Sequence, residues 1–355
     1  MAFRFLLFVL VAAFLSGCAS LPPGSEFPKT ASTAFAQPEQ TRFGREFADA
    51  AREHGGNSGF RMLAVGVDGF LTRAQMVNRA EQTNTVTHVV HGGAGTPCAV
   101  IDPVLDYDSR SGRTSTASLE LIESFLDEAK LTVAWILETH LHADHMTGAR
   151  RLKERRGGKT GIGAGIVVTQ RRFASLFNAE PGFSPDGSQF DHLFRDGERF
   201  RIGELEASAI ATPGHTPEGM TYVAGDVAFV GDTLFMPDGG TARCDFPGGD
   251  AAVLHRSIER ILSLPDHTRL FMCHDYMPGG REVRWETTVA AERAENIHLA
   301  GTDAEGFIAK RRARDQTLGL PALLIPSVQV NMRGGELPPA EANGVRYLKV
   351  PLDRL

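Results

Sequence analysis

Short apolar runs separated by Gly- and Pro-rich turns recur along most of the chain. Runs of this kind predict β-strands at residues 85–90, 98–101, 132–137, 165–169, 206–212, 220–223, 227–230 and 270–273. Apolar residues at the helical period of 3.6 predict helices at 43–54, 116–130, 147–156 and 251–264. Two batches of strands, with helices between and outside them, predict an α+β fold in which stacked sheets are covered by helices on both outer faces.

The first residues differ from this pattern. Arg4 precedes an apolar run from Phe5 to Leu15, which is too short to span a bilayer and is typical of a secretory signal peptide. The run ends in Leu-Ser-Gly-Cys, which resembles a bacterial lipobox and predicts lipidation of Cys18. We therefore expect an exported protein, anchored by lipid to the periplasmic side of the envelope, with a signal peptide at 1–17.

The remaining chain is expected to have three parts. Residues 18–59 are rich in Pro, Ser, Thr and Ala and predict a tether with one short helix. Residues 60–280 carry the strands and predict the catalytic domain. Residues 281–355 predict a C-terminal extension packed on that domain.

Charge and cysteine content exclude several kinds of partner and site. The net charge is −6, and the basic cluster at 310–314 has acidic neighbours, so we predict a solvated helix face there and no nucleic-acid binding. Membrane contact is expected only through the lipid anchor. Apart from Cys18 the chain has Cys98, Cys244 and Cys273, an odd number without metal-knuckle spacing, which argues against a disulfide framework.

The segment 139–145, Thr-His-Leu-His-Ala-Asp-His, follows the apolar strand predicted at 132–137. In an extended backbone, alternate side chains point the same way, so we expect His140, His142 and Asp144 on one side. His145 opens the next helix and can turn toward the same cavity. Burial of this many titratable side chains is costly without a counter-charge, so the segment predicts a metal site.

Three further residues have the same kind of position. His215 lies in the tight turn Thr-Pro-Gly-His-Thr-Pro, while Asp232 and His274 each directly follow an apolar strand. Taken singly, such a residue is usually a cap or a solvated side chain. In a chain that already carries a metal-binding segment, they complete a set of expected ligands: His140, His142, Asp144, His145, His215, Asp232 and His274.

This motif series, His-x-His-x-Asp-His, Gly-His, Gly-Asp-Thr and a late His, resembles that of the metallo-β-lactamase superfamily. The resemblance implies a four-layer αββα sandwich with metals at one edge. It also implies that His140, His142 and His215 form a first metal site and Asp144, His145 and His274 a second, with Asp232 between them.

The stretch 231–249 and the tail from Trp285 resemble the persulfide dioxygenases and the bacterial β-lactamase-like hydrolase branch. That likeness implies one Fe(II) per chain, held by His140, His215 and Asp232. It implies oxidation of glutathione persulfide, or a similar small persulfide, by O₂ to sulfite and thiol. A homodimer is among the oligomeric states that the sequence leaves open.

Two residues near the expected centre have alternative roles. Arg243 offers a bidentate fork for a substrate carboxylate, or else pairs with Asp245 in a structural role. Tyr276 donates a hydrogen bond to substrate or oxygen as a catalytic residue, or else is an ordinary half-buried tyrosine. Cys244 and Cys273 are expected to be inert packing residues.

Two other functions remain open. A dinuclear zinc hydrolase of the glyoxalase II or lactonase type would use all seven ligands and two Zn(II) ions. A lipid-anchored metal-binding protein without activity would require an inert centre. The expected export also departs from the cytosolic location that the resemblance implies, so inorganic polysulfide is an alternative substrate to glutathione persulfide.

Overall fold

The computed structural model describes residues 62–66, 74–79 and 84–354. The predicted signal peptide, Cys18, the tether and the helix at 43–54 lie outside these ranges and stay predictions. Within the described ranges, no helix combines the length and the apolar character needed to cross a bilayer.

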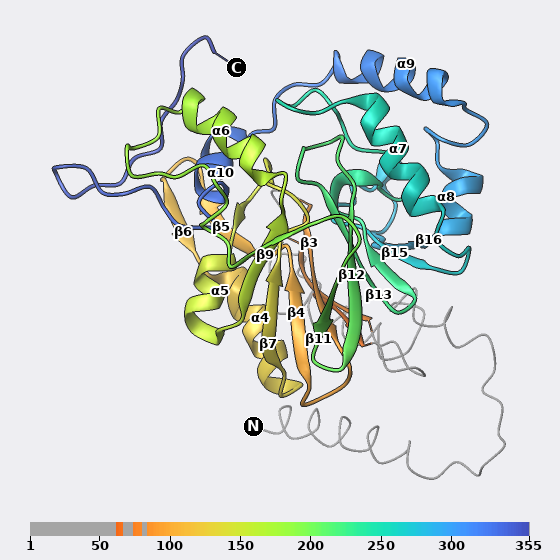
Figure 1. Cartoon of the computed structure of the whole chain (residues 1–355), viewed down its shortest axis with the longest axis horizontal. Coiled ribbons are helices and arrows are strands. Elements are labelled where there is room, and N and C mark those ends of the chain that lie inside the picture. The colour runs from red at the N-terminus through yellow and green to blue at the C-terminus, as the bar shows by residue number, and fades with distance from the viewer. Residues whose placement is uncertain (1–61, 67–73, 80–83, 355) are drawn as a thin grey trace. The chain divides into compact units, whose positions relative to one another are not determined.

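Two main β-sheets form the centre of the fold (Figure 1). The first sheet has seven strands in the order β1-β2-β3-β4-β7-β9-β10, namely Met62–Gly66, Ala74–Arg79, Val86–His91, Pro97–Ile101, Thr132–Leu137, Lys159–Gly163 and His192–Phe194. The second has six strands in the order β11 to β16, namely Glu198–Ile202, Leu205–Ala211, Met220–Ala224, Val227–Phe229, Arg269–Phe271 and Glu286–Thr288. A small sheet joins β5 (Val104–Asp108) to β6 (Arg113–Ser115) and β8 (Met146–Thr147).

Alternating side chains of the central strands divide the core into layers. In β4, Ile101 packs with Phe229 and Phe271 of the other sheet, whereas its neighbour Val100 packs with Leu119 of a covering helix. The period of two along a strand explains this, because successive side chains point to opposite faces.

The covering helices lie on the two outer faces (Figure 1). The first sheet is covered by α4 (Ala117–Glu128) and α5 (Ala149–Arg156). The second is covered by α7 (Ala251–Leu262), whose Leu254 and Ile258 pack on Leu270 of β15. The α+β fold and the four-layer αββα order are therefore confirmed.

The strand expected at 165–169 is wrong. This segment is the start of helix α6 (Ile166–Leu176), and the strand of this region is β9, immediately before it. The β-branched run of Ile166 and its neighbours is too short to distinguish a strand from a buried helix. The helical spacing becomes visible only when Gln170 and Phe173, which are also buried, are included.

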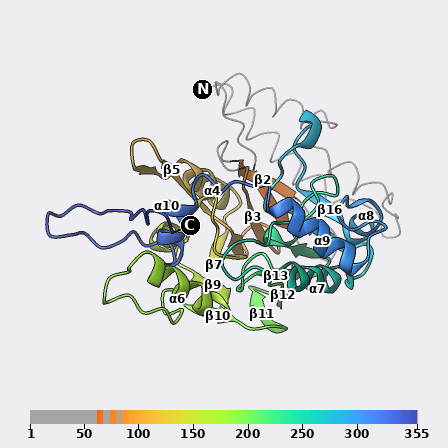
Figure 2. The ribbon, with the colours of Figure 1, turned by 90° about the horizontal axis from the view of Figure 1, so that it is seen from above.

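The C-terminal extension supplies three helices to the compact unit that contains both sheets. Helices α8 (Val289–Glu295) and α9 (Ala304–Asp315) pack on α7, while α10 (Leu324–Asn331) packs on β8. Figure 2 shows α10 at the end of the molecule opposite α8 and α9. The solvated face expected at 310–314 is wrong in part, because Arg311 is buried and pairs with buried Asp315 at 2.6 Å.

Candidate metal centre

The expected ligands lie at the carboxyl ends of strands from both sheets. Residues 138–145 follow β7, Asp232 follows β14 and His274 follows β15, while His215 lies in the connection from β12 to β13. Residues 138–145 contain bends and irregular backbone but no strand, so the alternation of side chains expected from the sequence does not position them. His142 instead lies between two neighbours, with its ring centroid 4.1 Å from that of His140 and 4.2 Å from that of His145.

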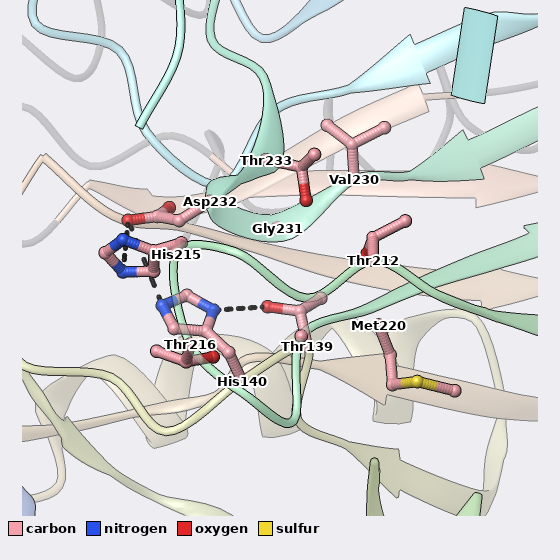
Figure 3. Close-up of a pocket in the computed structure, with 11 residues that line it drawn as sticks. Thr139, His140, Thr212, His215, Thr216, Met220, Val230, Gly231, Asp232 and Thr233 are labelled. Atoms are coloured by element: carbon pink, nitrogen blue, oxygen red, sulfur yellow. Dashed lines mark hydrogen bonds and ion pairs between the residues drawn. The ribbon is translucent and has the colours of Figure 1, made fainter. Parts of the chain in front are cut away.

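The first ligand group consists of His140, His215 and Asp232. One potential ligand atom from each lies within 4.8 Å of the other two. Asp232 Oδ2 is 3.9 Å from His140 Nε2 and 3.8 Å from His215 Nε2. Figure 3 shows the two imidazoles and the carboxylate meeting at one end of a small pocket, with Val230 and Met220 at the other end.

The rings of the first ligand group are oriented by atoms outside it. His215 Nδ1 lies 2.7 Å from the carbonyl oxygen of Arg243; because a carbonyl only accepts, this nitrogen carries the proton. Thr139 Oγ1 donates to Asp102 at 2.8 Å and therefore accepts from His140 Nδ1 at 3.0 Å. Both Nε2 atoms are thus left with a lone pair that faces the group, which is how metal-binding histidines are usually held.

The second ligand group consists of Asp144, His145 and His274. Asp144 Oδ2 lies 3.4 Å from His274 Nε2, and Asp144 Oδ1 lies 3.5 Å from His145 Nδ1. His274 Nε2 also lies 3.3 Å from Asp232 Oδ1. Asp232 therefore faces both groups, one through each carboxylate oxygen.

His142 is held from behind by two carboxylates. Its Nε2 lies 3.0 Å from Asp102 Oδ1 and 3.4 Å from Glu138 Oε2, and all three side chains are buried. Burial by itself would lower the pKa of His142, but Asp102 and Glu138 raise it well above its ordinary value. Its other nitrogen, Nδ1, has no hydrogen-bond partner among the described residues, and Nε2 lies beside the two carboxylates without hydrogen-bond geometry.

The buried atoms of both groups fit a metal ion. Among the described residues, seven buried atoms of the expected ligands have no hydrogen-bond partner, namely His140 Nε2, both ring nitrogens of His142, His145 Nε2, both ring nitrogens of His274 and Asp232 Oδ1. Unsatisfied buried polar atoms are rare in proteins and destabilising, so their gathering at one place needs an explanation. A dication satisfies those of the atoms that face it, and imidazole with carboxylate suits either zinc or iron.

A profile of the metallo-beta-lactamase superfamily matches residues 82–274, which contain every one of these ligands. The chain belongs to this superfamily. Both the predicted fold and the predicted resemblance are confirmed, and metal binding agrees with the side chains that the fold brings together.

Curated relatives fall into two kinds. A probable metallo-hydrolase of Burkholderia pseudomallei is 52% identical over 284 residues, 77% of this chain and 97% of that protein. A beta-lactamase hydrolase-like protein of Xylella fastidiosa is 51% identical over 77% of this chain, and the chain spans only 63% of it. The human mitochondrial persulfide dioxygenase ETHE1 is 30% identical over 71% of this chain and 84% of that protein.

A solved structure also supports the similarity to persulfide dioxygenases. The crystal structure of ETHE1 from Myxococcus xanthus superposes with a TM-score of 0.59 at 28% identity, covering 74% of this chain and 98% of that one. Homology to persulfide dioxygenases and to hydrolase-like proteins is therefore established together, and neither activity follows from it alone.

Arg243 is engaged with the protein itself. Its Nε and one terminal nitrogen donate to the two carboxylate oxygens of Asp245 at 2.6 Å each, and the other terminal nitrogen donates to the carbonyl of Gly319 at 2.7 Å. Its guanidinium also lies over the ring of Phe246. This geometry agrees with the structural alternative, and a substrate-binding role stays a prediction.

Tyr276 lies beside His274 and Cys273 beside the supporting Asp102, whereas Cys244 packs in the core cluster with Val230 and Leu234. The ring of Tyr276 stacks on that of His274 at 5.8 Å and is 53% exposed. Cys244 and Cys273 are both buried. Burial, assisted by Asp315, raises the pKa of Cys244 to about 12. Burial also raises the pKa of Cys273 well above its usual range. Both thiols therefore stay protonated at neutral pH, as the predicted packing role requires.

Three supporting residues were missed from the sequence. Asp102 accepts from the backbone N–H of Thr139 at 2.7 Å as well as from its hydroxyl. Glu218 accepts from the backbone N–H of Leu141 at 3.0 Å, and Asn331 donates to two carbonyls of the ligand segment. Only Asp102 could have been found from the sequence, because it directly follows an apolar strand, as several of the expected ligands do.

Proposed function

We propose that this protein is a non-haem iron persulfide dioxygenase that binds one Fe(II) through His140, His215 and Asp232. The observation that carries the proposal is the first ligand group, where two imidazole nitrogens and one carboxylate oxygen converge while the other nitrogen of each ring is held by the protein. Two histidines and one carboxylate on one face are typical of non-haem Fe(II) oxygenases. Homology to persulfide dioxygenase supports the same choice.

The reaction would convert one persulfide, one O₂ and one water into one thiol and one sulfite. A ferrous ion on this face would supply the redox chemistry and leave coordination positions for substrate and O₂. The protein supplies orientation and shielding. The ring of Phe246 meets that of His215 edge-on at 5.2 Å, and Tyr276 covers His274, so aromatic surface borders the ligands on two sides.

A dinuclear zinc hydrolase is the second candidate, and one observation favours it. The two carboxylate oxygens of Asp232 face different ligand groups, which is the arrangement that a carboxylate bridging two ions requires. Two ions in such a site activate a hydroxide for attack on a thioester or lactone. The hydrolase names of the bacterial relatives are compatible with this alternative.

The metal and the substrate separate the two candidates in one experiment. The full chain is reconstituted anaerobically with Fe(II) or, separately, with Zn(II), and each form is given glutathione persulfide, inorganic polysulfide or a glutathione thioester. We expect only the iron form to consume O₂, with one sulfite formed per O₂, and neither form to hydrolyse the thioester at an enzymatic rate. Thioester hydrolysis by the zinc form, without O₂ uptake by the iron form, would reverse the proposal. In the iron form, the rates of O₂ uptake with glutathione persulfide and with inorganic polysulfide are compared, and the faster one identifies the preferred substrate.

A further inference from the structure

One side chain from the C-terminal extension holds both ends of the metal-ligand segment His142–His145. Asn331 Nδ2 donates to the carbonyl oxygen of His142 and to that of His145, each at 2.8 Å. Its Oδ1 accepts from the backbone N–H of Thr147 at 2.8 Å. The amide thus uses both of its N–H groups and its oxygen on one short stretch of backbone.

Asn331 is itself firmly placed. It is the last residue of α10 and is only 4% exposed. The same helix buries Leu324 and Val328 in one cluster with Leu141, directly before the ligand segment, and Ala143 within it. Both the apolar side of α10 and its terminal amide therefore contact the segment that carries the ligands.

The ligand segment needs such support because it has no strand partner of its own. Residues 138–145 contain bends and irregular backbone but no strand, so no strand ladder orders the backbone of His142 to His145. A metal site loses affinity when its ligands must be ordered at the moment of binding, and groups behind the ligands reduce that loss. We propose that Asn331 is a positioning residue for the metal centre, and that metal affinity depends on its three hydrogen bonds.

The same helix offers a matched control. Gln329 is 3% exposed and also makes three hydrogen bonds to backbone. Its Nε2 donates to the carbonyls of Ile325 and Lys349 at 2.8 and 3.0 Å, and its Oε1 accepts from the N–H of Lys349 at 2.8 Å. These bonds connect α10 to the C-terminal tail and not to the ligand segment. Loss of either amide removes the same number of bonds, but only Asn331 holds the backbone of His142, whose ring lies 4.1 Å from that of the expected ligand His140.

The test compares metal affinity and stability in Asn331→Ala and Gln329→Ala of the full chain. Affinity is measured by chelator competition with Zn(II) and, anaerobically, with Fe(II); stability is measured by thermal unfolding of the metal-free proteins. We expect both variants to melt at a lower temperature, and only Asn331→Ala to bind metal roughly 10- to 100-fold more weakly. Asn331→Ser keeps one donor and should give an intermediate affinity, which covers the case in which the alanine variant does not fold.

Two outcomes overturn the proposal. One is wild-type affinity in Asn331→Ala or Asn331→Ser, and the other is an equal loss of affinity in Gln329→Ala. Because affinity is read with either metal and without a substrate, the outcome does not depend on whether the protein is a dioxygenase or a hydrolase.

Discussion

The two ligand groups contain the same kinds of residue but are stabilised in different ways. In the first group, the second nitrogen of each imidazole is occupied by Arg243 or Thr139, so the metal-facing atoms have no partner inside the group. In the second group, the side chains face one another, and His274 Nε2 lies 3.3 and 3.4 Å from the carboxylates of Asp232 and Asp144. Burial by itself would lower the pKa of His274, but Asp232 and Asp144 raise it above its ordinary value.

This difference shows that a count of ligand-type residues does not decide how many ions a site holds. The first group directs two imidazole nitrogens and one carboxylate toward each other, and the other nitrogen of each ring is already hydrogen-bonded outside the group. In the second group, the imidazole of His274 lies between two carboxylates, its own partner Asp144 and Asp232 of the first group, which offset its charge when it is protonated. We therefore expect the first group to bind metal and the second to support it.

The largest expected effect is the loss of metal in Asp232→Ala. Asp232 is the only carboxylate of the first ligand group, so its removal leaves two neutral imidazoles, and affinity should fall by more than the roughly 100-fold typical of a supporting residue. The measurement is metal content after reconstitution and desalting. Asp226→Ala, at an exposed position between β13 and β14, serves as control and should bind like the wild type. Retention of stoichiometric metal in Asp232→Ala would show that the first group is not the binding site.

A smaller effect is expected for His274→Ala. His274 belongs to the second group, so the iron should remain bound and the rate of persulfide oxidation should fall less than about tenfold, the lower end for a supporting residue. Iron content and O₂ uptake are measured on the same preparation. If iron is lost as completely as in Asp232→Ala, the two groups act as one site and the comparison between them fails.

The ion pair of Arg243 and Asp245 holds the residue whose backbone carbonyl accepts from His215. Substitutions in this pair therefore test whether it helps to orient the ring of His215. The pair is partly exposed, so we expect Arg243→Lys and Asp245→Asn each to lower the melting temperature modestly, with a coupling of about 0.5–1 kcal/mol in the double mutant. Activity should fall equally on glutathione persulfide and on an uncharged alkyl persulfide. A loss confined to glutathione persulfide would instead identify Arg243 as the substrate anchor.

The smallest effect concerns the buried carboxylate of Glu292, whose only side-chain hydrogen bond among the described residues comes from Asn296. Burial raises the pKa of Glu292 to about 8, from an ordinary value of 4.5. Because the carboxyl group ionises at lower pH in the unfolded chain, the folded state loses stability as pH rises from about 4.5 to 8. Glu292→Gln should therefore gain melting temperature over the wild type progressively between pH 5 and pH 9, measured by thermal unfolding.

The control for this prediction is Glu295→Gln, an exposed position on the same helix. It should show no pH-dependent difference from the wild type. A constant difference between Glu292→Gln and the wild type at every pH would mean that Glu292 is already ionised at pH 5. Burial would then not raise the pKa of Glu292, just as it does not raise that of Asp144, which its histidine neighbours hold low.

The sequence predicted the residues that gather at the candidate centre better than it predicted their surroundings. Asp232 and His274 could be found because each directly follows a short apolar strand, and this local pattern survives folding. Residues such as Asn331 and Glu218 act only through contacts with segments far away in the sequence, and no local pattern marks them. The helix at Ile166 was mistaken for a strand for a related reason, since its burial is set by packing against α10 and its neighbours.

The most direct test of the account is the number of iron ions that each chain binds. Wild-type protein and Asp144→Ala are reconstituted anaerobically with excess Fe(II), desalted, and analysed for iron and protein. The account predicts one iron per chain in both, because Asp144 belongs to the second ligand group and the iron to the first. Two ions per chain in the wild type, falling to one in Asp144→Ala, would contradict it.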